Sequence, residues 1–227
     1  INAKGSWGLF EAIRHQGENY CPRLVFTSSI AVFGAPFPDK IPDDFFTTPL
    51  TSYGAQKAIS ELLLADYSRK KMIDGVSIRL PTICVRPGKP NLAASGFFSG
   101  IIREPLNGQE AILPVNPDVR HWHATPRAAA GFLVHAAEID TSQLNDRITL
   151  NMPGLSVTVQ EQIDALERVA GSNVVKLIKH QPDPTIQKIV SGWARNFDTK
   201  RSIELGFKAE TNFDEIIKTY IEDDLKK

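Results

Sequence analysis

The sequence predicts an α/β fold built on a doubly wound parallel sheet, followed by a smaller and less regular α+β region. Residues 23–28 and 76–80 are short, apolar and rich in β-branched side chains, as buried parallel strands are. They alternate with helical patterns over residues 2–16 and 52–72, which is the usual order in such a sheet. Ligands bind at the carboxyl ends of the strands in sheets of this kind, so the residues at those ends are the first candidates for a site.

A long loop and a change of pattern accompany these elements. Residues 33–51 contain four prolines, so we predict a loop that lines a pocket at the edge of the sheet. Beyond Pro81, glycine and proline interrupt the chain more often. The elements expected there are strands over residues 119–124 and 147–151 and helices over residues 126–137, 158–170, 183–191, 199–205 and 212–224. The helix over 158–170 begins with a capping box made by Thr158 and Glu161.

The composition argues against several classes of protein. The 227 residues, 42% of them hydrophobic and 23% charged, are typical of a globular protein with a sizeable core. The net charge is zero and no basic block occurs, so we expect no nucleic-acid partner. No apolar run reaches the ~18 residues of a membrane span, so we expect no membrane partner. Cys21 and Cys84 have no metal-like spacing, which predicts a reduced, cytoplasmic protein.

Tyr53 and Lys57 are the most informative pair of residues. They stand four positions apart at the start of the helix predicted over 52–72, so their side chains project from the same face. A cation ~4 Å from a phenol contributes roughly 4 kcal/mol at an effective dielectric of ~20, which favours the phenolate and suits general acid/base catalysis. Ser29 lies 24 positions before Tyr53, at a strand end. Taken alone, such a pair is also found on ordinary helix surfaces, and Ser29 could be a strand-end cap.

Three ordered motifs make the pattern specific. Residues 25–34, 49–57 and 78–83 resemble motifs of the extended short-chain dehydrogenase/reductase family, the NAD-dependent epimerase/dehydratase group. The resemblance runs from about Asn2 to the C-terminus, and it implies a Rossmann-type sheet with a smaller C-terminal substrate-binding region. Residues 85–91 and 100–106 are similar to the members that act on small sugar acids such as D-erythronate.

The resemblance also implies how the chain is divided. A glycine-rich phosphate-binding turn opens the sheet in this family, but no such string occurs here, so we expect the first half of the sheet, on the order of 100 residues, to be missing. Residues 1–85 then form the C-terminal half of the dinucleotide-binding domain. Residues 86–227 are mainly the substrate-binding region, with segments near 119–151 returning to the core sheet. The expected cofactor is NAD, and NADP stays open because the residue that decides between them follows the missing turn.

The same resemblance assigns the chemistry. Tyr53 takes the proton of a substrate hydroxyl while hydride leaves the same carbon for the nicotinamide, and Lys57 supports the tyrosine and binds the nicotinamide ribose. Ser29 holds the reacting oxygen, which makes Ser29, Tyr53 and Lys57 the expected catalytic residues. Cofactor contacts are expected from both catalytic side chains of the helix and from four strand-end residues: Thr27, Ser28, Pro81 and Ile83.

The expected substrate contacts include one cation. Arg120 matches a family position that meets an anionic part of the substrate, and a guanidinium can grip a carboxylate through two parallel hydrogen bonds. The other expected contacts are Ser29, Asn91 and Ser95, and Arg86 is a further anion contact to consider. His121 and His123 have no third ligand at a recognisable spacing, so we predict that they bind no metal.

These observations predict an NAD-dependent oxidoreductase that oxidises the 2-hydroxyl of a small sugar acid to the 2-oxo acid. Two alternatives stay open: a nucleotide-sugar epimerase of the same family and a non-catalytic NAD(P)-sensing binding protein. Thr82 replaces the asparagine of many nucleotide-sugar members, and Ile30 and Ala31 stand where dehydratases carry an acidic pair. The helix over 52–72 has an apolar stripe that includes Ile59 and Leu62, and it could pair with its copy in a homodimer.

Overall fold

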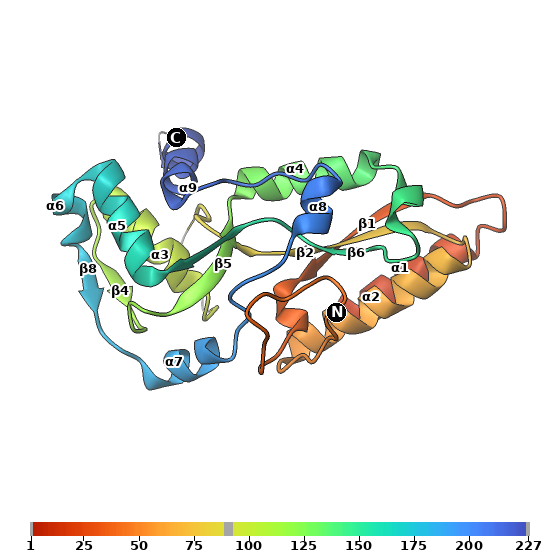
Figure 1. The fold of residues 1–227 in the computed structure, drawn as a ribbon, viewed down its shortest axis with the longest axis horizontal. Helices are drawn as coiled ribbons and strands as arrows, with labels where there is room; N and C mark the ends of the chain where they lie inside the picture. Colours follow the sequence, from red (N-terminus) through yellow and green to blue (C-terminus); the bar gives the residue numbers. More distant parts are fainter. Residues whose placement is uncertain (1, 89–92, 226–227) are drawn as a thin grey trace. The chain divides into compact units, whose positions relative to one another are not determined.

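A computed structural model describes residues 2–88 and 93–225, and its chain divides into two compact units (Figure 1). The first unit contains the residues up to Pro81, residues 130–153 and residues 197–208. The second contains residues 82–129, residues 154–196 and the chain from Ala209 onward. The first change of unit lies close to the expected boundary at residue 85, but the chain then passes between the units four more times.

The first unit is a parallel sheet of three strands in the order β1-β2-β6. Strand β1 runs in register with β2 from Arg23 opposite Asp74 to Ser29 opposite Leu80, so both strands end at the same edge. Helices α1 and α2 lie along one side of the strands, and α4 and α8 lie along the other (Figure 1). This arrangement confirms the predicted α/β class. The elements are α1 (Asn2–Arg14), β1 (Arg23–Ser29), η1 (Ile30–Val32), α2 (Ser52–Arg69), β2 (Asp74–Leu80), α4 (Pro126–Glu138), η2 (Thr141–Leu144), β6 (Thr149–Asn151) and α8 (Lys200–Glu204).

Helix α2 turns a mixed face to the protein, where Ala58, Ser60, Glu61 and Leu64 are buried. Ile59 and Leu62 of the apolar stripe are 49% and 70% exposed. The pairing of this stripe in a homodimer stays a prediction. Among the described residues, the structure has no helix with the length and apolar character needed to cross a bilayer.

The second unit contains two small sheets, β3-β5-β7 and β4-β8. Strand β5 is parallel to β3 and antiparallel to β7, so of the segments near 119–151 it is β6 that pairs with the sheet of the first unit. The elements are β3 (Thr82–Ile83), α3 (Gly96–Leu106), β4 (Ala111–Leu113), β5 (Arg120–Ala124), β7 (Leu155–Thr158), α5 (Val159–Ala170), α6 (Ser172–Val175), β8 (Ile178–His180), α7 (Pro184–Ser191), α9 (Phe213–Tyr220) and the π-turn η3 (Ile221–Leu225).

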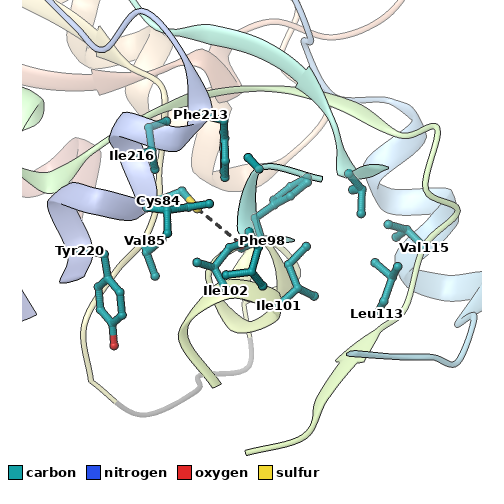
Figure 2. Close-up of a cluster of buried hydrophobic side chains, with 14 of the residues drawn as sticks. Cys84, Val85, Phe98, Ile101, Ile102, Leu113, Val115, Phe213, Ile216 and Tyr220 are labelled. Carbon is teal, nitrogen blue, oxygen red and sulfur yellow. Dashed lines mark hydrogen bonds between the residues drawn. The ribbon is translucent and has the colours of Figure 1, made fainter. Parts of the chain in front are cut away.

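The core of the second unit forms where α3 and α9 meet the chain after β3 (Figure 2). Phe98 of α3 and Phe213 of α9 are buried beside Cys84. The Cys84 thiol donates a hydrogen bond to the Phe98 carbonyl at 3.3 Å, drawn as the dashed line in Figure 2. Burial raises the pKa of the Cys84 thiol to about 12, so the thiol stays protonated and belongs to the packing of the core.

Candidate active site

The Tyr53 and Lys57 side chains come from the first turns of α2, where Thr51 caps the helix by accepting from the Gly54 amide at 3.0 Å. The Lys57 ammonium lies 5.7 Å from the centre of the Tyr53 ring and 4.9 Å from that of Phe26. Its Nζ donates to the Thr27 carbonyl at 2.6 Å. The cation is therefore held at the carboxyl end of strand β1. Tyr53 is 48% exposed, so its hydroxyl is accessible to a ligand.

The electrostatic state of Lys57 reflects two opposed influences. Burial lowers the pKa of Lys57 from its ordinary value, because the charged form loses water. The carboxylate of Glu61, one helical turn further along α2, acts in the other direction and raises the pKa. Glu61 therefore supports the charged form of Lys57 against the effect of burial.

Ser29 occupies the turn against which the start of α2 packs. Its hydroxyl accepts a hydrogen bond from the Ala31 amide at 3.1 Å and so caps the short helix η1. Gly54 lies so close to this turn that a Cβ atom would stand 2.0 Å from the Ala31 carbonyl oxygen. Because the Ser29 hydroxyl uses only an acceptor site in the cap, its hydrogen is free to be donated to a substrate oxygen.

The other strand-end residues of the first unit are placed differently from one another. Thr27 contributes its carbonyl to Lys57. Ser28 is 2% exposed and its hydroxyl donates to Glu61, so its side chain is turned inward. Pro81 is buried directly after β2, at the edge where β1 also ends.

Two residues of this region, Glu61 and Arg79, were not predicted from the sequence. They form a buried ion pair with Nη2 to Oε2 at 2.8 Å and Nε to Oε1 at 3.0 Å. The available signal was the position of Glu61, four residues after Lys57 and eight after Tyr53, on the same face of the helix. A charged residue on the inward face of a helix requires a partner, and that requirement points to a strand cation.

The described site residues expected in the second unit each have their own contacts. Ile83 is half-buried in β3, and Ser95 precedes α3 with its Oγ 3.5 Å from Nη2 of Arg86. Arg120 lies at the start of β5, where Nη1 donates to the Ser156 carbonyl at 2.6 Å and Nη2 pairs with Glu161 at 3.2 Å. Asn91 falls outside the described residues.

The second unit also contains a pocket of about 380 Å³ beside α3 and β4. Arg86, Ser99 and Gly100 are among its lining residues. Arg103 at its wall donates to the Arg86 carbonyl at 2.8 Å and pairs with Glu104 at 2.6 Å. Both basic and acidic residues therefore line this pocket, among them Arg86, Arg103 and Glu104.

His121 and His123 are buried on strand β5. The Nε2 atom of His121 lies 2.6 Å from Oγ1 of Thr82, and its ring stacks on Phe98 at 5.0 Å. Burial lowers the pKa of His121 to about 4 and that of His123 well below its ordinary value. Both rings are therefore neutral members of the core at pH 7. Within residues 2–88 and 93–225 there is no group of three or more His, Cys, Asp and Glu side chains placed to hold a metal ion.

The first unit thus combines a parallel sheet with a tyrosine and a lysine that lie one helical turn apart at the carboxyl edge of its strands. The sequence pattern of the family described as NAD dependent epimerase/dehydratase matches residues 1–143. The chain belongs to this family.

Individual relatives refine the comparison. The chain is 47% identical over 98% of its length to a D-erythronate dehydrogenase of Cupriavidus necator, and 43% identical over 89% of its length to a D-erythronate dehydrogenase of Haemophilus influenzae. It covers 68% and 64% of these proteins, so it spans about two thirds of their length.

Solved structures agree on the fold. A structure described as the nucleoside-diphosphate-sugar epimerase from Agrobacterium tumefaciens is 61% identical, with a TM-score of 0.97 over the whole chain and 67% of its own. A GalE-like L-threonine dehydrogenase from Cupriavidus necator, in its holo form, is 21% identical with a TM-score of 0.84 over 98% of this chain and 70% of its own. At that identity the second likeness concerns the fold alone.

Proposed function

We propose that the protein is an NAD-dependent oxidoreductase that oxidises the 2-hydroxyl of a small sugar acid, such as D-erythronate, to the 2-oxo acid. The observation that carries the proposal is the Lys57 ammonium, fixed on the Thr27 carbonyl one helical turn from the Tyr53 phenol. The two relatives named D-erythronate dehydrogenase support the class of substrate.

In the proposed reaction the chain moves a proton and holds an oxygen. Ser29 donates a hydrogen bond to the oxygen of the reacting hydroxyl and orients it towards Tyr53. The Tyr53 phenolate, favoured by Lys57, accepts the hydroxyl proton as the C–O bond becomes a carbonyl. A bound nicotinamide supplies the acceptor for the hydride of the same carbon.

Lys57 has the capacity to bind the ribose of such a cofactor. An ammonium has three N–H donors, and the Thr27 carbonyl uses one of them. The remaining donors are enough for two ribose hydroxyls. The inward side chain of Ser28 leaves its backbone as the group that would approach the cofactor. Pro81 and Ile83 are proposed contacts of the carboxamide, and NAD is proposed over NADP.

Arg120 is the proposed contact of the substrate carboxylate, with Ser95 and Asn91 as further contacts. The guanidinium is already held by the Ser156 carbonyl and by Glu161, whose side chain is 51% exposed. An ion pair at such an exposed position is weak, so a substrate carboxylate can compete for the guanidinium.

A screen of four- to six-carbon aldonates against NAD and NADP with the full-length protein tests the proposal. We expect NADH formation, followed by absorbance, with an equal amount of 2-oxo acid, and the highest kcat/KM for a four-carbon acid. A protein that reduces neither cofactor with any aldonate contradicts the proposal.

The 61% identity to a structure described as a nucleoside-diphosphate-sugar epimerase favours one alternative. An epimerase interconverts its sugars without net reduction of the cofactor, so chromatography of the products alongside NADH measurement separates the two activities. A cofactor-sensing protein without catalysis is the other alternative. It would bind cofactor and turn over neither class of substrate.

A further inference from the structure

Glu61 is a buried charge that the proposed reaction does not yet use. It lies on the face of α2 that carries Tyr53 and Lys57, and it is 5% exposed. Its Oε1 accepts from the Ser28 hydroxyl and from Nε of Arg79 at 3.0 Å, and its Oε2 accepts from Nη2 of Arg79 at 2.8 Å. The carboxylate is therefore fixed from two neighbouring strands, β1 and β2.

Arg79 is itself held on its remaining sides. Its Nη1 donates to the Asp43 carbonyl at 3.2 Å and to Oδ1 of Asn151 at 3.4 Å. Its guanidinium carbon lies 4.7 Å from the centre of the Phe33 ring. The long loop over residues 33–51 and strand β6 thus join β2 in fixing the cation that fixes Glu61.

Stability alone is a weak reason for such a pair. Removing two charges from water costs several kcal/mol per ion, and apolar residues of similar volume often serve a buried site equally well or better. A role in fixing the position of helix α2 explains the buried charges more directly. Lys57 binds the Thr27 carbonyl, and one turn later Glu61 binds the Ser28 hydroxyl, so two successive residues of β1 set the register of α2.

The charge of Glu61 acts on Lys57 as well. Facing Lys57 are the ring of Phe26 and the Thr27 carbonyl from β1, and the ring of Tyr53 from its own helix. Glu61 is the charged group that opposes the loss of the Lys57 proton, against the burial that favours it. The guanidinium of Arg79 on β2 holds the Glu61 carboxyl on α2 through paired hydrogen bonds.

We propose that Glu61 is a positioning residue: its buried carboxylate, held by Arg79 and Ser28, fixes α2 against β1 and so places the Lys57 ammonium on the Thr27 carbonyl. The expected effect on the rate of reaction rests on the proposed function, whereas the expected effect on the position and titration of Lys57 does not.

The test uses Glu61→Gln in the full-length protein, with Asp66→Asn as the matched control. Gln keeps the shape and an acceptor for Ser28 but lacks the charge, and Asp66 lies on the same helix in an exposed pair with Arg69 and Lys70. Lysines are ¹³C-methylated, the Lys57 signal is assigned with Lys57→Arg, and its titration is followed by NMR without cofactor. We expect the Lys57 midpoint to move to lower pH in Glu61→Gln and to stay in place in Asp66→Asn.

Kinetics supply the second measurement. In Glu61→Gln we expect kcat to fall roughly tenfold or more while KM for the sugar acid stays within about threefold, because the residue orients Lys57 and touches no substrate. The double variant Glu61→Gln/Arg79→Met removes the unpaired cation, so its melting temperature should recover towards that of the wild type while kcat stays low.

Two results overturn the inference: a Lys57 midpoint that does not move in Glu61→Gln, or a double variant that recovers kcat together with its melting temperature. If the wild-type protein oxidises no sugar acid but the Lys57 midpoint still moves, the proposed function fails and the positioning of Lys57 by Glu61 stands.

Discussion

The two units of the molecule treat the polar groups beside their strands in different ways. In the first unit, Glu61 and Arg79 are linked by paired hydrogen bonds one helical turn from Lys57. In the second unit, His121 and His123 are enclosed by an apolar core that lowers their pKa and keeps them neutral. The first unit places an ammonium close to a half-exposed phenol, and the second keeps the two histidines of β5 neutral in its core. Chemistry that depends on an ammonium is therefore expected to belong to the first unit.

Removing the ammonium of Lys57 gives a large expected effect on catalysis. Lys57→Met should lower kcat/KM for the sugar acid by roughly 10²-fold or more, because the phenolate of Tyr53 loses its neighbouring cation. Lys70→Met is the control, since Lys70 ends the same helix in an exposed pair with Asp66, and its kcat/KM should change less than about twofold. Steady-state kinetics on both variants check this difference. Equal activity in Lys57→Met and wild type would show that the reaction does not need the charge of Lys57.

Lowering the pH should destabilise the protein through the neutral, buried histidines of the second unit. Because burial lowers the pKa of His121 to about 4, the unfolded chain binds the proton first as the pH falls below ~6.5. The contribution of His121 to stability is complete above that pH and is lost towards pH 4, by about 3 kcal/mol in total.

Urea unfolding of wild type and His121→Gln at several pH values measures this loss. The wild type should become less stable with acid more steeply than the variant does. His15→Gln, at an exposed position just after α1, should follow the wild type. Parallel curves for wild type and His121→Gln would show that this ring is not held neutral by the core.

A methyl group at Gly54 tests how closely the start of α2 packs on the turn after Ser29. Gly54→Ala should lower the free energy of unfolding by about 1–3 kcal/mol, because the new Cβ would meet the Ala31 carbonyl. Gly131→Ala in α4 is the matched control, since nothing lies within 4 Å of its Cβ position, and it should raise stability by about 0.5–1 kcal/mol. Denaturant unfolding measures the free energy of unfolding of both variants. Similar values for the two would mean that the turn moves readily to make room for the methyl group.

The smallest expected effect concerns Arg120 of the second unit. Arg120→Ala should raise KM for the sugar acid by roughly tenfold, equivalent to about 1.4 kcal/mol, and leave kcat nearly unchanged, because the guanidinium binds the carboxylate equally before and during the reaction. Arg127→Ala, which breaks an exposed pair with Asp223, serves as the control. An unchanged KM in Arg120→Ala would mean that Arg120 contacts Ser156 and Glu161 but does not bind the substrate.

The first unit could be predicted closely from the sequence because its elements are long and regular. The strand expected over residues 23–28 is observed at Arg23–Ser29, and the helix expected over 52–72 is observed at Ser52–Arg69. The four-residue spacing, about one helical turn, was enough to predict that Tyr53 lies beside Lys57. The partner of Glu61 could not be predicted, since Arg79 reaches it from a different strand, and side-chain pairing across elements depends on the register of the fold.

The second unit was harder to predict for identifiable reasons. Helix α3 was missed because Gly96, Gly100 and Pro105 indicate interruption, yet the proline lies in the last turn, where the helix ends. Strands β4 and β8 have three residues each, which is too short for a period to appear. Helix α5 was predicted because its capping box at Thr158 is a local signal, and the structure contains that box.

The role of Tyr53 as the proton acceptor is tested most directly by single-turnover oxidation of the sugar acid in Tyr53→Phe, with cofactor affinity measured on the same protein by fluorescence titration. Phe keeps the ring and removes the hydroxyl, so the rate of hydride transfer should fall by roughly 10²- to 10⁴-fold while the cofactor dissociation constant changes by less than about threefold. A Tyr53→Phe protein that binds cofactor normally and transfers hydride at the wild-type rate would contradict a reaction that runs through this phenol.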